Sequence, residues 1–320
     1  MGELFAIGEA LIDMIPEETG KEIKNTSAFR PQCGGAPANV CGAFSKLGGK
    51  SNLLTCLGDD PFGDKLMDNF RENQIGSSYI KRTDEANTAL AFVTLMEDGN
   101  RDFSFYRKPS ADMLLRPEDL EEKWFSNCDI LHFCSVALVR DPMKSAHDKA
   151  IDYARANQAW ISFDPNLRFP LWSDLEALRS TVLDYIPKAD ILKVSDEEID
   201  FIANGVEGTT EDRIRSLFIG NVKMIIFTKG ADGAEVYLKN GLHAYAPSEK
   251  VKAIDTTGAG DAFIGSFLYQ LHRDGMRPQD ILEDGDSVIE KLQVFLEKSN
   301  QYCGKSVQEI GAIASYPKNI

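Results

Sequence analysis

Short apolar runs alternate with longer segments of helical period along most of this chain, and that order constrains the fold most. A repeated strand-then-helix order calls for right-handed crossovers and a mainly parallel sheet covered by helices. The sequence therefore predicts an α/β fold. The expected strands are Leu4–Ile7, Asn52–Leu57, Ile130–Phe133, Trp160–Phe163, Ile191–Lys193, Met224–Thr228 and Ala234–Leu238, and the expected helices are Pro37–Leu47, Pro61–Asn73, Pro142–Asn157, Ser173–Tyr185 and Gly258–Leu271.

Two segments, about 10–34 and about 86–108, do not follow this strand-then-helix order and resemble short strands joined by turns. Met96–Asn100 has the composition of a hairpin turn. In the second segment Phe103, Phe105 and Arg107 would share one face of a strand, and Ser104 and Tyr106 the other. We expect a small β-sheet lid beside the main sheet, although ordinary surface hairpins fit the periodicity equally well. No linker divides the chain, so we expect one domain over residues 1–320.

Composition narrows the function classes. The chain has 35 basic and 50 acidic residues, a net charge of −15, which argues against nucleic acid or an anionic membrane as the main partner. Its six cysteines show no CxxC spacing, so free thiols fit better than a disulfide framework or a zinc site. The first residues show no signal-peptide pattern. These features predict a cytoplasmic protein with no membrane contact.

The strongest local signal is the stretch Asp255–Asp261, which reads DTTGAGD and opens a helix of regular apolar spacing. A helix N-terminus offers unpaired N–H groups and a partial positive charge, and so suits a phosphate group. Gly258 and Gly260 allow the backbone to approach such a group closely. The stretch is therefore a candidate phosphate site.

Asp261 lies in the first turn of this helix, facing the same anion. A carboxylate there is unfavourable unless a hydroxyl proton lies between it and the phosphate, which is where a general base for an attacking alcohol belongs. The alternative is an acid that only offsets the helix dipole. A dinucleotide fingerprint is excluded because Phe263 stands where glycine or alanine is needed, and a Walker A motif ending at Ser306 is excluded because it needs glycine at Ser299.

Polar clusters directly follow three of the expected strands: Asp164–Arg168, Ser195–Glu198 and Thr228–Gly230. The carboxyl ends of parallel strands share one edge of a sheet, where α/β proteins bind ligands. Arg168 can fork onto phosphate oxygens, and Glu198 can hold Mg²⁺ directly or through water. Each cluster alone also suits a solvated loop.

Near the other end of the chain, Gly34 and Gly35 precede a helix that begins with Asn39 in its first turn. The glycines admit a ligand close to the backbone, and Asn39 offers a donor and an acceptor to a hydroxyl group. Asp13, just after the first strand, is a candidate acceptor for neighbouring sugar hydroxyls. A turn and a polar helix start would explain the same residues.

The residues from Gly34 to Asn39 and from Asp255 to Asp261 resemble the two signatures of the PfkB (ribokinase-like) family of carbohydrate kinases, and the likeness covers essentially the whole chain. It implies a doubly wound α/β domain whose β-lid often forms a homodimer. It implies ATP and Mg²⁺, with K⁺ bound near Asp255 and Thr257 in many relatives. The implied site residues are Asp261 as base; Gly258, Ala259 and Gly260 as anion hole, with Gly258 and Gly260 also touching nucleotide; Arg168 near the reacting groups; Asp13, Gly34, Gly35, Asn39, Phe105, Arg107 and Asn166 as sugar contacts; Lys193, Thr228 and Gly230 on the nucleotide side; and Glu198 for Mg²⁺.

Two stretches of the chain depart from the family pattern. Ser195 stands where the family commonly has asparagine, three residues before the magnesium-linked glutamate. Tyr302 and Lys305 stand where the family tends to have small residues beside adenine, which bears on the preference for ATP.

Several stretches resemble bacterial fructokinases in particular, among them Gly8–Asp13, Phe103–Arg107 followed by Ala111–Asp112, and Lys193–Glu198. The implied reaction converts ATP and D-fructose to fructose 6-phosphate, with Phe105 against the apolar side of the sugar. Ribokinase, 2-keto-3-deoxygluconate kinase and nucleoside kinase activities stay open, as does a sugar sensor without catalysis, which an intact Asp261 argues against.

Overall fold

A computed structural model describes residues 2–18, 20–95, 101–283 and 285–319. Within these ranges the main sheet has nine strands in the order β15-β14-β13-β12-β11-β10-β1-β4-β6. All neighbours from β13 to β6 pair in parallel, while β14 and β15 pair antiparallel at one edge. The strands are β1 (Glu3–Ile7), β4 (Ser51–Leu54), β6 (Ile75–Gly76), β10 (Cys128–Cys134), β11 (Trp160–Asp164), β12 (Ile191–Ser195), β13 (Met224–Thr228), β14 (Ala234–Leu238) and β15 (His243–Ala246).

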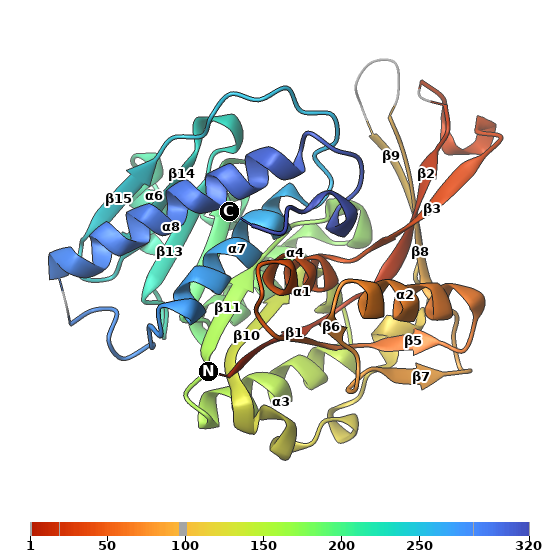
Figure 1. Ribbon diagram of the computed structural model, residues 1–320, viewed down its shortest axis with the longest axis horizontal. Helices are drawn as coiled ribbons and strands as arrows, with labels where there is room; N and C mark the ends of the chain where they lie inside the picture. Colours follow the sequence, from red (N-terminus) through yellow and green to blue (C-terminus); the bar gives the residue numbers. More distant parts are fainter. Residues whose placement is uncertain (1, 19, 96–100, 284, 320) are drawn as a thin grey trace.

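Helices cover both faces of this sheet (Figure 1). Alternate strand residues explain why, because Leu4 and Ala6 belong to one buried apolar cluster whereas Phe5 and Ile7 belong to the other. A strand that is apolar on both sides needs a helix on each, as in a doubly wound fold. The first cluster takes in α1 (Ala36–Lys46), α2 (Pro61–Glu72), α7 (Ala259–Arg273) and α8 (Gly285–Ser306), and the second takes in α3 (Met143–Ala156), α4 (Leu175–Tyr185), α5 (Asp196–Ile202) and α6 (Thr210–Ser216).

The predicted α/β class is confirmed, with two differences in detail. The expected strand Asn52–Leu57 is two strands, because the chain leaves the main sheet after β4 and continues as β5 (Cys56–Gly58), which pairs with β7 (Lys81–Thr83) in a separate ribbon. The long helix α8 and the edge strand β15 were not expected from the sequence. The core strands and the first turns of α1, α2 and α7 lie within one or two residues of their expected positions.

The second, smaller sheet has the order β3-β2-β8-β9 and stands away from the main body (Figure 1). Its strands are β2 (Leu11–Pro16), β3 (Phe29–Gly34), β8 (Ala89–Leu95) and β9 (Arg101–Tyr106). Both segments that break the α/β rhythm therefore form it together, and β2 pairs in parallel with β8 across a large sequence distance. The predicted turn Met96–Asn100 lies outside the described residues.

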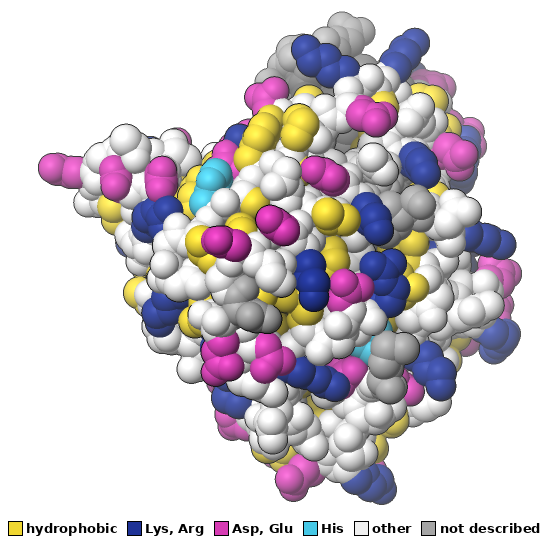
Figure 2. All heavy atoms as spheres, turned by 60° about the vertical axis from the view of Figure 1, so that its left-hand side comes forward, with side chains coloured by type: hydrophobic (Ala, Val, Ile, Leu, Met, Phe, Trp, Pro, Cys, Tyr) yellow, Lys and Arg dark blue, Asp and Glu magenta, His cyan; other side chains and the backbone are white. Residues whose placement is uncertain are grey.

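One face of the molecule, shown in Figure 2, carries basic side chains singly or in small groups between acidic ones. This mixture agrees with the net charge of −15 and offers no continuous basic surface there to a polyanion. Within the described ranges, no helix combines the length and the apolar character that crossing a bilayer requires.

Candidate active site

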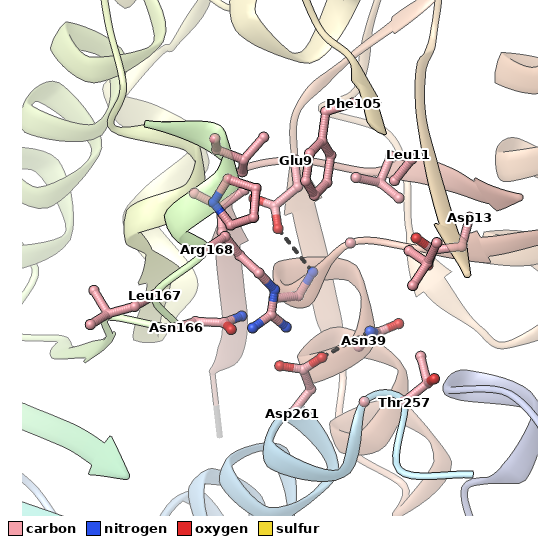
Figure 3. A pocket seen from close by; sticks show the side chains of 18 of the residues that line it. Glu9, Leu11, Asp13, Asn39, Phe105, Asn166, Leu167, Arg168, Thr257 and Asp261 are labelled. Atoms are coloured by element: carbon pink, nitrogen blue, oxygen red, sulfur yellow. Dashed lines mark hydrogen bonds between the residues drawn. The ribbon is translucent and has the colours of Figure 1, made fainter. Parts of the chain in front are cut away.

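A cavity of about 360 Å³ opens where the small sheet faces the carboxyl ends of the parallel strands. This volume suits a small ligand. The site residues predicted from the sequence that line it are Asp13, Gly35, Asn39, Phe105, Arg107, Asn166, Arg168, Thr257, Gly258 and Asp261 (Figure 3).

The start of α7 forms the floor of the cavity. Gly258 precedes the helix in the left-handed region, at φ +72°, and a β-carbon there would lie 2.5 Å from Tyr316 Oη and 2.7 Å from Ala312 Cβ. Only glycine satisfies both constraints. The N–H of Ala259 donates to Thr256 O (3.2 Å), while those of Gly260 and Asp261 have no partner within the described residues. Of the predicted anion-hole residues, Ala259 is therefore the one whose N–H already has a partner.

Asp261 is buried in the first turn of α7 and accepts a hydrogen bond from Asn39 Nδ2 (2.8 Å). Burial raises the pKa of Asp261 to about 6, against the opposing effects of the Asn39 hydrogen bond and of the charges on Arg168 and Lys193; the carboxylate of Asp164 adds to the rise. An acid that only offsets a helix dipole would be expected at the surface. Asp261 instead faces a cavity with a pKa close to neutrality, which is typical of a general base.

Asp13 and the glycines before α1 meet at the side of the cavity. A β-carbon on Gly34 would lie 2.2 Å from Asp13 Oδ2, and one on Gly35, at φ +110°, would lie 2.5 Å from Glu9 O. Burial raises the pKa of Asp13 to about 7, partly offset by the charge of Arg168. Gly34 itself does not line the cavity; its missing side chain leaves room for Asp13.

The lid supplies Phe105 and Arg107, and the loop after β11 supplies Asn166 and Arg168. Asn166 has a positive φ of 46°, which lets the chain turn directly after the strand. Arg168 extends into the cavity between Glu9 and Asp261 (Figure 3). Arg107 is buried in an ion pair with Asp112.

Eight of the predicted residues lie outside the cavity lining: Gly34, Ala259 and Gly260, described above, and Lys193, Glu198, Thr228, Gly230 and Asp255. Lys193 is buried beneath the start of α7, where its Nζ donates to Asp164 Oδ2 (2.8 Å) and lies 3.5 Å from the position of a β-carbon on Gly260. Glu198 Oε1 accepts from Leu167 N (2.8 Å) and its Oε2 from Ser195 N (3.0 Å), so it ties two strand-end loops together. Thr228 ends β13 and Gly230 follows it. Asp255 lies in the loop before α7, where it accepts a hydrogen bond from Thr257 N.

The C-terminal strap, residues 307–316, holds the loop that precedes α7. Asp255 Oδ1 accepts from Thr257 N (2.9 Å) and Thr257 Oγ1 (2.6 Å), and its Oδ2 accepts from Gly311 N (2.8 Å). Tyr316 Oη donates to Gly258 O (2.8 Å). These bonds fix the orientation of the N–H groups at the start of α7.

Sequence reasoning missed Glu9 and Asp112 as parts of this site. Glu9 is buried, its Oε1 accepts from Ala36 N (3.0 Å), and its Oε2 has no partner within the described residues. Burial raises the pKa of Glu9 to about 7, although the nearby charge of Arg107 lowers it. The signal that could have found them is that both are acids in otherwise apolar stretches, next to residues already selected.

A second cavity, of about 250 Å³, lies beside α8 and includes Asn300, Gly304 and Lys305. Tyr302 does not contribute to it: the side chain is fully buried, and its hydroxyl lies 3.4 Å from Ala43 O on α1. Of the two residues expected to bear on the preference for ATP, Tyr302 is therefore turned toward the core by the helical period of α8, whereas Lys305 lines this cavity.

The chain is similar to known proteins over nearly its whole length. The sequence matches the pfkB family carbohydrate kinases over residues 1–317. It is 40% identical over 316 residues to probable fructokinase-2 of Arabidopsis thaliana, covering 99% of this chain and 93% of that one. The crystal structure of the Xylella fastidiosa fructokinase with bound ATP superposes with a TM-score of 0.88 at 33% identity, covering 99% of this chain and 96% of that one.

A double mutant of the Vibrio cholerae O395 fructokinase, in a form with fructose, ADP and potassium ion bound, superposes with a TM-score of 0.83 at 31% identity, covering 99% and 96% of the two chains. The family match spans nearly every residue and includes both glycine-rich stretches that line the cavity. This chain is therefore a member of the pfkB family of carbohydrate kinases.

Proposed function

We propose that this protein transfers the γ-phosphoryl group of ATP to the primary C6 hydroxyl of D-fructose. The observation that carries the proposal is Asp261, a buried carboxylate with a pKa raised to about 6 that faces a sugar-sized cavity beside unpartnered N–H groups. Relatives named fructokinase, at 38–40% identity over nearly the whole chain, support fructose as the sugar.

In this mechanism Asp13, Asn39 and the lid hold the sugar, with Phe105 against its apolar side. Asp261 Oδ accepts the proton of the primary hydroxyl as its oxygen attacks the γ-phosphorus in line. The hydrogen bond from Asn39 Nδ2 orients the carboxylate for this transfer. The N–H groups of Gly260 and Asp261, with Arg168, stabilise the charge that develops on the phosphoryl oxygens. Closure of the lid would exclude water, which otherwise competes with the sugar.

The nucleotide would enter from the opposite side of α7, with its base in the cavity beside Asn300 and Lys305 and its phosphates near Lys193, Thr228 and Gly230. Among the described residues, no group of three or more His, Cys, Asp and Glu side chains could hold a metal ion. Magnesium would therefore be held by the phosphates and by waters, and Glu198 would contact it through water because both of its oxygens already accept backbone N–H groups. The magnesium ion would supply positive charge that offsets the negative charge of the phosphates.

A K⁺ ion would lie at the loop of Asp255 and Thr257. That loop is held in a fixed shape by the C-terminal strap, which fits a site built from backbone carbonyls and one carboxylate. The Vibrio cholerae protein with potassium ion bound supports this part of the proposal. Replacing K⁺ by tetramethylammonium in the assay buffer should lower turnover if the ion binds here.

The test is a coupled ADP-release assay with fructose, ribose, mannose, 2-keto-3-deoxygluconate and adenosine as acceptors. We expect the highest kcat/KM with fructose. Asp261→Asn should lower kcat by about 10²–10⁴-fold, because general-base help of this kind has that magnitude, while fructose affinity by calorimetry stays near the wild-type value. Retention of more than about a tenth of wild-type kcat would remove Asp261 from the role of base.

The same assay separates the enzyme from a sugar sensor. A sensor would bind one of these sugars without releasing ADP. Preference for adenosine would instead indicate a nucleoside kinase.

A further inference from the structure

We propose that Asp112 restricts the sugar site to uncharged substrates by occupying the positive charge of Arg107. The inference rests on the proposed sugar kinase function and adds the class of sugar that the cavity admits: a neutral ketose is accepted and a sugar acid is rejected. An arginine in the wall of a sugar site would ordinarily attract a substrate carboxylate. The contacts of Arg107 argue that it does not do so here.

The guanidinium of Arg107 is already engaged on two of its three nitrogens. Its Nη2 donates to Asp112 Oδ2 and lies 3.2 Å from Met113 Sδ, while Nη1 donates to Val136 O (3.3 Å). Nε has no partner within the described residues, but it is buried rather than presented to the cavity. A carboxylate is recognised by two parallel N–H groups on one edge of a guanidinium. Both such edges include Nη2, which already faces Asp112 and Met113.

Asp112 is itself held in place for this pairing. Its side chain is fully buried, and its Oδ1 accepts from the hydroxyl of Ser110 while Oδ2 faces Arg107. The short helix η2 (Ala111–Leu114), which carries Asp112, follows β9 after residues 107–110, so both members of the ion pair lie on one short stretch of chain.

The charges around this end of the cavity leave no surplus positive charge. Both Asp112 and Glu9 stabilise the charged form of Arg107 and so raise its pKa, which places two carboxyl groups near one guanidinium. The other arginine of the cavity, Arg168, extends between Glu9 and Asp261, so it lies beside the base and not at the buried pair of Arg107 and Asp112. A carboxylate brought to the lid end would lose its hydration and meet further negative charge.

The experiment compares kcat/KM for fructose with that for 2-keto-3-deoxygluconate in wild type, Asp112→Asn and Ser110→Ala. In Asp112→Asn the guanidinium regains an uncompensated charge. The ratio of kcat/KM for the acid to kcat/KM for fructose should therefore rise about tenfold or more, through a lower KM for the acid. Ser110→Ala removes a neighbouring hydrogen bond and keeps the ion pair, so its ratio should equal that of wild type. If Asp112 has a purely structural role, the substitution would lower kcat/KM for both substrates alike. The ratio would then stay unchanged, and the proposal would be overturned.

Asp112→Asn leaves a buried arginine unpaired, which can prevent folding. The double variant Arg107→Met/Asp112→Leu removes both charges, and such an apolar replacement of a buried pair is commonly tolerated. It should still reject the acid, because the guanidinium that would bind the carboxylate is gone. Acceptance of the acid by this double variant, or by the wild-type enzyme as readily as fructose, would also overturn the proposal.

These outcomes are distinct from failure of the fructose assignment. If wild type prefers mannose or ribose and Asp112→Asn gains the acid, the role of Asp112 stands and only the identity of the neutral sugar changes. If wild type prefers fructose and Asp112→Asn shows no increase in kcat/KM for the acid, the fructokinase proposal stands and the proposed role of Asp112 is wrong.

Discussion

Three acids in the cavity share one physical condition. Burial raises the pKa of Glu9 and Asp13 to about 7 and that of Asp261 to about 6. Each group therefore changes its protonation near neutral pH, whereas an exposed carboxyl would be ionised throughout that range. Of the three, only Asp261 lies at the unpartnered N–H groups of α7, so it is the one whose ionised form should control turnover.

Turnover should depend on pH through Asp261. A base accepts a proton only when ionised, so kcat for fructose should be constant above pH 7 and fall as the pH drops through about 6. The measurement is kcat at saturating fructose and ATP from pH 5 to pH 8.5. The residual activity of Asp261→Asn should lack this decrease; the same decrease in the variant would assign it to another group.

Glu9 should make the folded protein less stable as the pH rises. Its pKa is raised from 4.5 to about 7 in the folded protein, so its contribution to stability is fully present below pH 4.5 and is lost as the pH rises through 7. Glu9→Gln imitates the protonated form. The variant should match wild type at pH 5 and be more stable at pH 8 by on the order of 1–3 kcal/mol, measured by urea unfolding. Equal stability at pH 8 would contradict a raised pKa for Glu9.

At the scale of elements, the start of α7 depends on packing from the far end of the chain. Tyr316 and Ala312 lie against Gly258, and Gly311 N donates to Asp255. The left-handed turn is thus fixed both by backbone conformation and by contact with the C-terminal strap. Two glycines of similar φ allow these causes to be separated.

Gly258→Ala should nearly abolish activity, because its β-carbon would lie 2.5 Å from Tyr316 Oη at φ +72° and displace the strap or the turn. Gly275→Ala is the matched control: its φ is +67°, and no atom lies within 4 Å of its β-carbon. The control should lose only about 1 kcal/mol from backbone strain and keep wild-type kcat. Circular dichroism melting and the ADP-release assay measure both effects; similar losses of activity in the two variants would contradict the packing argument.

The elements that the sequence predicted are those whose signals are local. The glycines before α7 and the apolar runs of β10 to β13 are visible in a short window, and so is the position of Asp261 in the first helical turn. The ion pair between Arg107 and Asp112, the brace from Tyr316 and the bond between Asn39 and Asp261 depend on residues brought together by the fold. Helix α8 was not predicted, although its buried residues Val288, Leu292, Phe295 and Leu296 have helical spacing.

Side-chain direction also limited the sequence-based site. Tyr302 and Lys305 are near neighbours in sequence, yet only Lys305 reaches the second cavity. Lys305 lies on the face of α8 that carries Gln301, Gly304 and Gln308, whereas Tyr302 lies on the buried face with Phe295, Ser299 and Ser306. The family signatures placed Gly34 correctly in the chain but not its function, which is to leave space for Asp13.

For the molecule as a whole, the small sheet is the part least covered by other elements. Tyr106 on β9 is 63% exposed and packs against Phe92, which in turn contacts Phe29. An exposed aromatic cluster on a protruding sheet suits contact with a second copy. We therefore expect the predicted homodimer to form through the lid.

Tyr106→Asp should shift the protein toward monomer in sedimentation velocity at micromolar concentration, because it introduces charge into the apolar contact. Tyr245→Asp is the matched control, since Tyr245 is 43% exposed on β15 at the opposite edge of the molecule. The control should sediment as wild type. Equal sedimentation of both variants and wild type would place any dimer contact elsewhere.

The bond from Tyr316 to Gly258 also makes the reaction sensitive to cleavage of one short segment. A protease cut between residues 307 and 316 would leave most of both buried clusters around the main sheet in place but release the turn before α7. We expect the clipped protein to stay folded and to lose phosphoryl transfer.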